Sequence, residues 1–332
     1  MIQADFYMNF KYFLWNLSIG WYEHIPILYR WYEHSIKREV LRHPVPQHVA
    51  IIQDGNRRYA KKLGQPAEQG HWRGADTTEK VLDWCGELGI KQLTLYAFST
   101  ENFKRPENEK KALFDLFKHF CRKARDSKRT HESRLRIRPV GDISLLPDDV
   151  KDEIALTEAA TAGYDRFYLN VAVAYGGRQE IIDGARKMAM DVKSGKLSPE
   201  SITESVVDRY LYFGTETRSQ VDLIIRTGGD ERTSNFLPWQ ASGNECAIYI
   251  SAPYWPEFRK IDFLRAIRAY QIRERDHMIK MAVSMLKVKR HNGGFKMEDF
   301  KRGLASALKI PMDEVENIIK HPVVQRELAR TP

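Results

Sequence analysis

Cysteine is scarce in this sequence, and sites that depend on it are not indicated. Cys85, Cys121 and Cys246 lie far apart, and no CxxC pair occurs. Neither a disulfide framework nor a zinc site is therefore expected, and a reducing compartment suits the chain. The loops GxxxxGKS/T and GxGxxG are absent as well, so nucleoside triphosphate and dinucleotide sites have no support.

Long apolar runs are also missing. The longest uncharged run near the start covers only residues 12–22, which is too short for a helix that spans a bilayer. The first residues lack the basic start, the apolar block and the small-residue cleavage site of a secretory signal. We therefore expect a cytoplasmic protein whose contact with a membrane, if any, is peripheral.

Positive charge is in excess. The formal net charge is +9, and hydrophobic residues make up 42% of the chain, which is enough for a buried core. Such a charge suits anionic partners: nucleic acid, acidic lipid or a phosphorylated substrate. Aromatic residues cluster near the N-terminus instead of alternating with a basic stripe, so we expect no nucleic-acid partner.

Residues 1–45 form an aromatic-rich extension that we expect to be helical. Eleven aromatic residues lie from Phe6 to Tyr32, and the tetrapeptide WYEH occurs at Trp21 and again at Trp31. Aromatic rings mixed with His, Lys and Arg are typical of a helix at a membrane interface. Alternatively, the rings pack on the rest of the protein or at a subunit contact.

From residue 46 onward, strand-like apolar runs alternate with helical patterns. The expected strands are Val49–Ile52, Gln92–Phe98, Arg136–Val140, Arg166–Ala174, Val221–Ile225 and Cys246–Ile250. The expected helices include Thr77–Leu88, Glu109–Ala124, Asp148–Ala160 and Arg178–Lys193. The alternation predicts an α/β domain over residues 46–276, with a central, mostly parallel six-stranded sheet surrounded by helices. Residues 277–332 are expected to be a charged helical extension without chemistry.

In such sheets, ligands bind beyond the carboxyl ends of the strands. Asp54-Gly55-Asn56 follow the first strand, and Arg57 and Arg58 then begin a helix. The free N–H groups of such a turn bind anions. Cations in a first turn oppose the helix dipole unless an anion binds or Asp54 pairs with them. The alternative is an Asp54 N-cap followed by a solvated basic face.

Arginine recurs at other strand ends. Arg105 follows the second expected strand, Arg178 the fourth, and Arg226 and Arg232 the fifth. The last two of these turns also contain a Gly-Gly pair. Guanidinium groups match phosphate oxygens, and glycine lets the backbone approach a ligand closely. Four such turns at one sheet edge predict a polyphosphate pocket.

Other polar residues have two interpretations each. His71 can donate to a phosphate oxygen near neutral pH, or it caps or packs a helix. Asp54 and Glu245 are candidate ligands for Mg²⁺, which takes one or two carboxylates plus phosphate oxygens; Glu245 is otherwise a hydrated rim acid. Residues 148–152 spell DDxxD, a magnesium-binding signature of all-helical enzymes, but they begin a helix, where acids complement the dipole.

Five stretches in this order resemble the cis-prenyltransferase family, which includes undecaprenyl and dehydrodolichyl diphosphate synthases. They are HVAIIQDGNRR with AKK and GH (His48–His71), YAFSTENFKRP (Tyr96–Pro106), LNVAVAYGGRQEI (Leu169–Ile181), DLIIRTGGDERTSNFLPWQ (Asp222–Gln240) and WPEF (Trp255–Phe258). The likeness runs from about His48 to Arg275. The resemblance implies condensation of isopentenyl diphosphate with an allylic prenyl diphosphate to form a Z double bond, with Mg²⁺ as cofactor. It also implies a homodimer and a hydrophobic tunnel, with Phe167 near its floor.

The resemblance further implies roles for single residues. Asp54 would bind Mg²⁺ and assist diphosphate departure, and Glu245 would bind the metal as well. Ser99 and Asn102 would assist proton removal near the reacting carbon. The allylic diphosphate would contact Gly55, Asn56, Arg57, Arg58, Tyr59 and His71. The isopentenyl diphosphate would contact Arg105, Arg226, Arg232, Thr233 and Ser234, and the substrate site would include Thr100, Glu101 and Phe103.

Two positions depart from the family pattern. Ala67 stands where many members have an arginine that touches the allylic diphosphate, and residues 276–278 lack the RxG ending of active members. Two alternatives therefore stay open beside the main interpretation. One is non-head-to-tail coupling of two allylic diphosphates, with dimethylallyl diphosphate as acceptor. The other is a non-catalytic partner subunit of a heteromeric enzyme.

Overall fold

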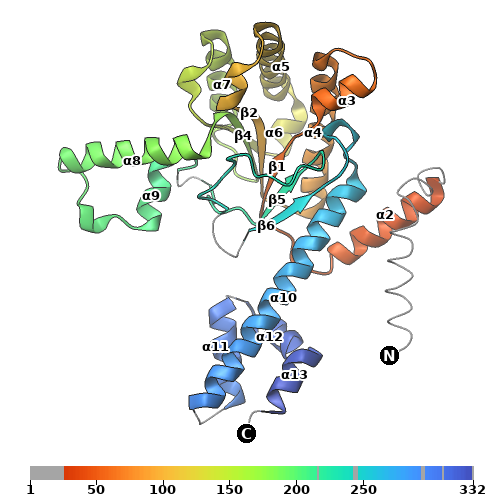
Figure 1. Cartoon of the computed structure of the whole chain (residues 1–332), viewed down its shortest axis with the longest axis vertical. Helices are drawn as coiled ribbons and strands as arrows, with labels where there is room; N and C mark the ends of the chain where they lie inside the picture. The colour runs from red at the N-terminus through yellow and green to blue at the C-terminus, as the bar shows by residue number, and fades with distance from the viewer. Residues whose placement is uncertain (1–25, 215–216, 242–245, 293–295, 309, 331–332) are drawn as a thin grey trace. The chain divides into compact units, whose positions relative to one another are not determined.

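The computed structural model describes residues 26–214, 217–241, 246–292, 296–308 and 310–330. The chain divides into two compact units, Met1–Ile267 and Arg268–Pro332 (Figure 1). The domain boundary expected after residue 276 falls inside helix α10 (Lys260–Asn292), which begins in the first unit and continues in the second. Among the described residues, no helix combines the length and the apolar character that crossing a bilayer requires.

The first unit is built on a sheet of six strands in the order β3-β4-β2-β1-β5-β6. Every neighbouring pair is parallel. The strands are β1 (His48–Ile52), β2 (Gln92–Ser99), β3 (Leu135–Val140), β4 (Phe167–Tyr175), β5 (Leu223–Arg226) and β6 (Ala247–Ile250). All residues of β1 are buried, as expected for a central strand covered on both faces. The predicted α/β architecture and all six predicted strands are confirmed.

Helices surround this sheet (Figure 1). They are α2 (Pro26–Val40), α3 (Asn56–Lys62), α4 (Ala67–Leu88), α5 (Glu107–Asp126), α6 (Lys128–Glu132), α7 (Asp148–Thr161), α8 (Gly177–Lys193), α9 (Glu204–Tyr210) and the start of α10. Short 3-10 turns occupy Thr100–Lys104, Ile143–Leu145, Pro199–Ser201 and Trp255–Glu257. Helix α4 begins well before the expected Thr77, because Pro66 precedes its first turn and the helix tolerates Gly70 and Gly74 within it.

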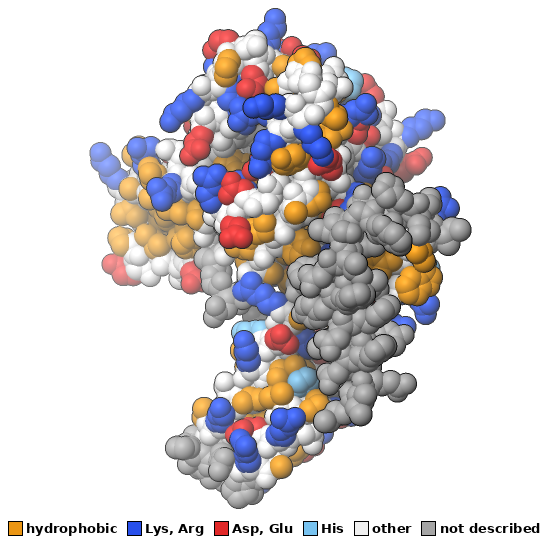
Figure 2. All heavy atoms as spheres, turned by 45° about the vertical axis from the view of Figure 1, so that its right-hand side comes forward, with side chains coloured by type: hydrophobic (Ala, Val, Ile, Leu, Met, Phe, Trp, Pro, Cys, Tyr) orange, Lys and Arg blue, Asp and Glu red, His pale blue; other side chains and the backbone are white. Residues whose placement is uncertain are grey.

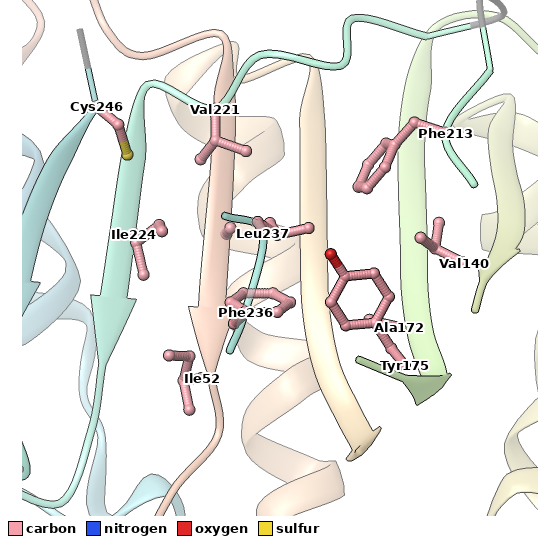
Figure 3. Packing of buried hydrophobic residues seen from close by; sticks show 11 residues of the cluster. Ile52, Val140, Ala172, Tyr175, Phe213, Val221, Ile224, Phe236, Leu237 and Cys246 are labelled. Carbon is pink, nitrogen blue, oxygen red and sulfur yellow. The ribbon is translucent and has the colours of Figure 1, made fainter. Parts of the chain in front are cut away.

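Two groups of buried side chains pack against the sheet. One contains Phe98 and Val173 with Leu113 of α5 and Val150 of α7. The other contains Ala50, Ile52, Val140, Ala172, Tyr175, Phe213, Val221, Ile224, Phe236, Leu237 and Cys246. Phe236 and Leu237 follow β5 in the sequence and lie over the strands next to Tyr175 (Figure 3). This packing anchors the segment that carries Arg232 and Ser234.

The second unit has its own core. The end of α10 packs with α11 (Met297–Leu308), α12 (Met312–Ile319) and α13 (Pro322–Leu328). Its buried residues are Ile279, Ala282, Leu286, Phe300, Leu304, Val315, Ile318, Ile319 and Val324. The expected helical character of the C-terminal residues agrees with these elements.

Candidate active site

Asp54 lies between two arginines at the carboxyl end of the central strands. The last residue of β5, Arg226, is the register partner of Ile52 in β1. Its Nη2 donates to Asp54 Oδ2 at 2.8 Å, and Arg58 Nη2 lies 3.1 Å from Asp54 Oδ1. The helix cap is Gly55, so the alternative of an Asp54 N-cap is wrong. The carboxylate instead joins guanidinium groups from two segments that are distant in sequence.

The turn that holds Asp54 is fixed from three directions. Gly55 has φ +106°, and a Cβ there would lie 2.6 Å from Tyr254 Cδ1, so only glycine fits. The carbonyl of Asp54 accepts from Thr227 Oγ1 at 2.8 Å and from Trp255 N–H at 2.9 Å. On the other side, a Cβ on Gly70 would lie 2.1 Å from the Asn56 carbonyl oxygen. Close backbone packing therefore sets the direction of the Asp54 side chain.

Arg226 is the most enclosed cation of the site, with 4% of its surface exposed. Its Nη1 donates to Ser234 Oγ at 2.8 Å and to the carbonyl of Arg232. Its Nε has no hydrogen-bond partner among the described residues. Buried arginine is costly unless its charge is matched, and here Asp54 and Asp230 match it, at 2.8 and 3.3 Å.

Arg232 differs from Arg226 in exposure. Its side chain is 76% exposed, and its Nε donates to Asp230 Oδ1 at 3.0 Å. That hydrogen bond, with the charge of Arg226, lowers the pKa of Asp230 to about 2. Ser234 has φ +50°, a left-handed backbone that a serine rarely adopts without support. Asn235, the next residue, also has a positive φ of +59°, and its Oδ1 accepts from the Arg178 N–H at 2.9 Å.

A second acid, Glu109, lies close to two further arginines and to His71. It lies in the first turn of α5, and its Oε1 accepts from Arg105 Nη1 at 2.8 Å. Arg57 Nη1 lies 3.8 Å and His71 Nε2 3.6 Å from the same carboxylate. Sequence reasoning overlooked Glu109 as a site residue. The signal was the i, i+4 spacing from Arg105, which favours an ion pair on a helix.

His71 is buried in α4, at 9% exposure. Burial, assisted by the charge of Arg105, lowers the pKa of His71 to about 4. The ring is therefore neutral at pH 7, and its Nε2 has no hydrogen-bond partner within the described ranges. A neutral imidazole next to arginines can accept or donate one hydrogen bond without adding charge.

Ser99 and Asn102 cap one another at the end of β2. The N–H of Ser99 donates to Asn102 Oδ1 at 3.0 Å, and the Ser99 side chain accepts from the backbone of Asn102. Phe103 turns toward the core, with its ring centroid 5.0 Å from that of Phe98. A Cβ on Gly176 would lie 2.8 Å from Thr100 Oγ1, so the Thr100 side chain lies against the backbone that follows β4. The cap orders this corner of the site.

The other predicted residues differ in placement. Glu101 and Thr233 are exposed, and Tyr59 is half-buried in α3. Glu245 lies outside the described residues. The DDxxD acids Asp148 and Asp149 begin α7 and pair with Lys151 and Lys118. Figure 2 shows Lys and Arg side chains spread over the visible face of the molecule, as the net charge of +9 leads one to expect.

Of the two predicted metal ligands, Asp54 is the one that the structure describes. No group of three or more His, Cys, Asp and Glu side chains is placed to hold a metal within the described part of the chain. Asp54, half-exposed and adjacent to cationic groups, suits Mg²⁺ held jointly with diphosphate oxygens, because this ion often uses only one or two carboxylates. The residues present therefore fit a substrate-bridged magnesium and not a closed protein site.

An apolar cavity of about 650 Å³ opens beside these residues. Gln53, Asn56 and His71 line it at the site. Its walls come from β2, β4, α4 and α5, with Leu95, Ala97, Leu113, Leu116, Phe117, Phe120, Leu169 and Val171, and Phe167 lies farther along β4. Ion pairs from Glu79 to Lys123 and from Asp83 to Arg129 join α4 to α5 and α6 along it. This is the expected hydrophobic tunnel.

Comparison with known proteins gives consistent results. The family model described as putative undecaprenyl diphosphate synthase matches residues 52–277. The chain is 50% identical over 264 residues to a tritrans,polycis-undecaprenyl-diphosphate synthase (geranylgeranyl-diphosphate specific) of Methanosarcina mazei, covering 79% of this chain and 89% of the relative. A protein of the same name from Archaeoglobus fulgidus is 49% identical over 253 residues, 76% of this chain and 100% of the relative.

Two solved structures share the fold. Lavandulyl diphosphate synthase from Lavandula x intermedia, in complex with dimethylallyl diphosphate, superposes with a TM-score of 0.63 at 32% identity, over 70% of this chain and 96% of its own. A probable undecaprenyl diphosphate synthase from Campylobacter jejuni gives 0.55 at 33% identity, over 68% and 95%. Both solved structures therefore have the same arrangement of sheet and helices as this chain over about two thirds of its length.

Proposed function

The chain belongs to the undecaprenyl diphosphate synthase family of prenyltransferases, and from this premise we propose that it elongates geranylgeranyl diphosphate. It is a prenyltransferase that condenses isopentenyl diphosphate with an allylic prenyl diphosphate. Several relatives at 45–53% identity are named as geranylgeranyl-specific synthases, which supports this allylic substrate. The lavandulyl synthase is only 32% identical, so head-to-tail condensation is favoured over coupling of two allylic diphosphates.

The arrangement of acids supports two adjacent diphosphate sites. Each acid lies between an arginine expected at the allylic diphosphate and one expected at the isopentenyl diphosphate. Asp54 separates Arg58 from Arg226, and Glu109 separates Arg57 from Arg105. We place the boundary between the two substrates along the line from Asp54 to Glu109. The prenyl chain then lies in the apolar cavity that begins at Asn56 and His71.

The chemistry requires charge stabilisation more than covalent assistance. The allylic C–O bond breaks, a C–C bond forms to the double bond of isopentenyl diphosphate, diphosphate leaves and one proton is lost. Arg57 and Arg58 would stabilise the departing diphosphate, since preorganised cations act where charge develops. Arg226, Arg232 and Ser234 would hold the second substrate in line for attack. Ser99 and Asn102 would lie where the proton is removed.

Magnesium is part of this proposal. Asp54 is the residue that would hold it, together with diphosphate oxygens, and Glu245 remains a second proposed ligand. Bound there, Mg²⁺ would supply Lewis-acid stabilisation of the leaving diphosphate. A homodimer and peripheral contact with a membrane, through residues 1–45, complete the proposal.

One observation carries the assignment: a single carboxylate is held between arginines of two distant segments at the mouth of an apolar cavity. The test is incubation of the full chain with isopentenyl diphosphate, geranylgeranyl diphosphate and Mg²⁺, with mass spectrometry of the products. We expect longer prenyl diphosphates, and Asp54→Asn should lower kcat about 10³-fold. Asp148→Asn, an exposed acid outside the site, is the matched control and should keep full activity. Full activity of Asp54→Asn would contradict the proposal.

A further inference from the structure

The segment from Ser234 to Leu237 has a backbone that is rare for residues with a Cβ. Ser234, Asn235 and Leu237 have φ values of +50°, +59° and +52°, in the left-handed region. In the described part of the chain, three of the five non-glycine residues with positive φ therefore lie in this one segment. Such a conformation is costly and persists where neighbouring contacts hold it. The contacts around the segment therefore decide its shape.

Burial anchors the end of this segment. Phe236 and Leu237 are 1% and 0% exposed, and they lie over the strands (Figure 3). The Phe236 ring stacks on the Tyr96 ring, with centroids 4.4 Å apart and an interplanar angle of 8°. Ser234 is exposed, and its carbonyl accepts from the Tyr96 hydroxyl at 3.4 Å, which is long for a hydrogen bond. Apolar packing therefore fixes Phe236 and Leu237 more firmly than Ser234.

Asn235 connects the segment to helix α8. Its side-chain Oδ1 accepts from the N–H of Arg178 at 2.9 Å, and its carbonyl accepts from the N–H of Gly177, also at 2.9 Å. Gly177 and Arg178 begin α8, and the N-cap, Gly176, makes no side-chain cap. The first N–H groups of a helix have no partner within the helix, and Asn235 satisfies two of them. One residue thus joins the two elements through both its backbone and its side chain.

The segment lies directly against the start of α8. A Cβ on Gly177 would lie 2.1 Å from Pro238 Cδ and 2.8 Å from the Asn235 carbonyl oxygen. A Cβ on Gly176 would lie 3.6 Å from Asn235 Nδ2. The close approach that this glycine pair permits is therefore to a neighbouring segment of the protein itself. Backbone contact sets the separation between Asn235 and the helix.

On its other side, the segment contacts Arg226. Arg226 Nη1 donates to Ser234 Oγ at 2.8 Å and to the carbonyl of Arg232. A diphosphate on these residues would compete with Ser234 for the guanidinium, because arginine forms strong, charge-assisted hydrogen bonds with phosphate oxygens. Contacts that do not involve Arg226 would then keep Ser234 in place. The hydrogen bonds of Asn235 to α8, one residue along the chain, are contacts of this kind.

We propose that Asn235 is a positioning residue for isopentenyl diphosphate: its hydrogen bonds to the start of α8 hold Ser234 where this substrate binds. The inference rests on the proposed function, which assigns isopentenyl diphosphate to Arg226, Arg232 and Ser234. Asparagine suits the position for two reasons. It adopts a left-handed backbone more readily than most residues with a Cβ, and its short side chain reaches a nearby main-chain N–H. Asn235 acts through Ser234 and not by touching the substrate.

The experiment is steady-state kinetics of the full chain with Mg²⁺, in which isopentenyl diphosphate and geranylgeranyl diphosphate are varied in turn. Asn235→Ala removes the side-chain acceptor and disfavours the left-handed backbone, so we expect the KM for isopentenyl diphosphate to rise about tenfold. Asn235→Gly removes the acceptor but keeps the backbone conformation, so the rise should be smaller, about fourfold. In both variants the KM for geranylgeranyl diphosphate should stay within about twofold of the wild-type value.

Thr203→Ala is the matched control, because it removes a side-chain cap from another helix of the same unit. Thr203 Oγ1 accepts from the Val206 N–H at 3.4 Å at the start of α9. Loss of such a cap lowers stability, which thermal unfolding of all three variants measures. Both KM values of Thr203→Ala should equal those of the wild type.

An unchanged KM for isopentenyl diphosphate in Asn235→Ala would overturn the proposal. An equal rise in the KM of both substrates, or the same rise in Thr203→Ala, would overturn it as well, since either result would indicate a general loss of stability. If Asn235→Ala does not fold, Asn235→Gly decides by the same criteria. Failure of the assigned function is distinguishable, because the wild type itself would then form no product from these two substrates.

Discussion

At the scale of single residues, the site is a matter of charge balance. Asp54 and Glu109 each hold two arginines within 4 Å, so four guanidinium groups of like charge can share a small volume before any substrate arrives. Substrate diphosphates would take over much of this pairing. On the proposed function, the acids would keep the arginines in orientation until the substrates bind, which would account for an acid such as Glu109 in an anion-binding region.

Burial also decides the protonation of His71. Its pKa of about 4 lies below the value of about 6.5 in an unfolded chain. Between these values the unfolded chain binds a proton that the folded protein excludes, so stability falls as the pH drops from 6.5 toward 4. We expect His71→Gln to reduce the loss of unfolding free energy between pH 7 and pH 5 by about 2 kcal/mol. Denaturant unfolding of both proteins at pH 7 and at pH 5 measures this difference in unfolding free energy.

The exposed His34 provides the control for this prediction. His34→Gln should leave the pH dependence of stability as it is in the wild type. An equal effect of both substitutions would show that the burial of His71 is not the cause.

At the scale of elements, helix α4 supports the turn at Asp54 through its glycines. A Cβ on Gly70 would lie 2.1 Å from the Asn56 carbonyl oxygen, whereas nothing lies within 4 Å of a Cβ on Gly86 in the same helix. We expect Gly70→Ala to destabilise the protein by about 1–3 kcal/mol and to lower kcat/KM, because the start of α3 must move. Thermal unfolding and steady-state kinetics measure the two effects.

Gly86→Ala is the comparison variant for this prediction. Alanine is the better helix former by about 1 kcal/mol, so this substitution should keep or raise stability. Matching losses in the two variants would refute the role assigned to Gly70.

At the scale of the whole molecule, two cores divide the chain. Phe300 is fully buried in the second unit, and Phe98 is fully buried next to the sheet. We expect Phe300→Ala to lower the stability of the second unit by about 3–5 kcal/mol while prenyl transfer by the full chain persists. Phe98→Ala should destabilise the catalytic unit and reduce activity. Calorimetry with a parallel product assay distinguishes the two variants. Loss of activity in Phe300→Ala at temperatures where the first unit is folded would contradict the independence of the two cores.

The sequence by itself determined the strands, their parallel arrangement and the edge at which the arginines gather. Apolar β-branched runs such as Val49–Ile52, bounded by turn residues, have few other folded solutions. In a parallel sheet the residues that follow the strands meet at one edge, so the sequence predicts that Asp54, Arg105 and Arg226 lie together there. These features could be predicted because each depends on residues that are close in the chain.

The tertiary structure alone decided which charges pair and what surrounds them. Asp54 and Arg226 are 172 positions apart, and no periodicity shows that they share a hydrogen bond or that Glu109 orients Arg57 as well as Arg105. The close approach of α4 to α3 depends on Gly70, and the exposed face of α2 depends on how Ile36 and Val40 are buried. Such features arise from packing between distant segments, where the free energy of a side chain is set by neighbours that the linear order does not reveal.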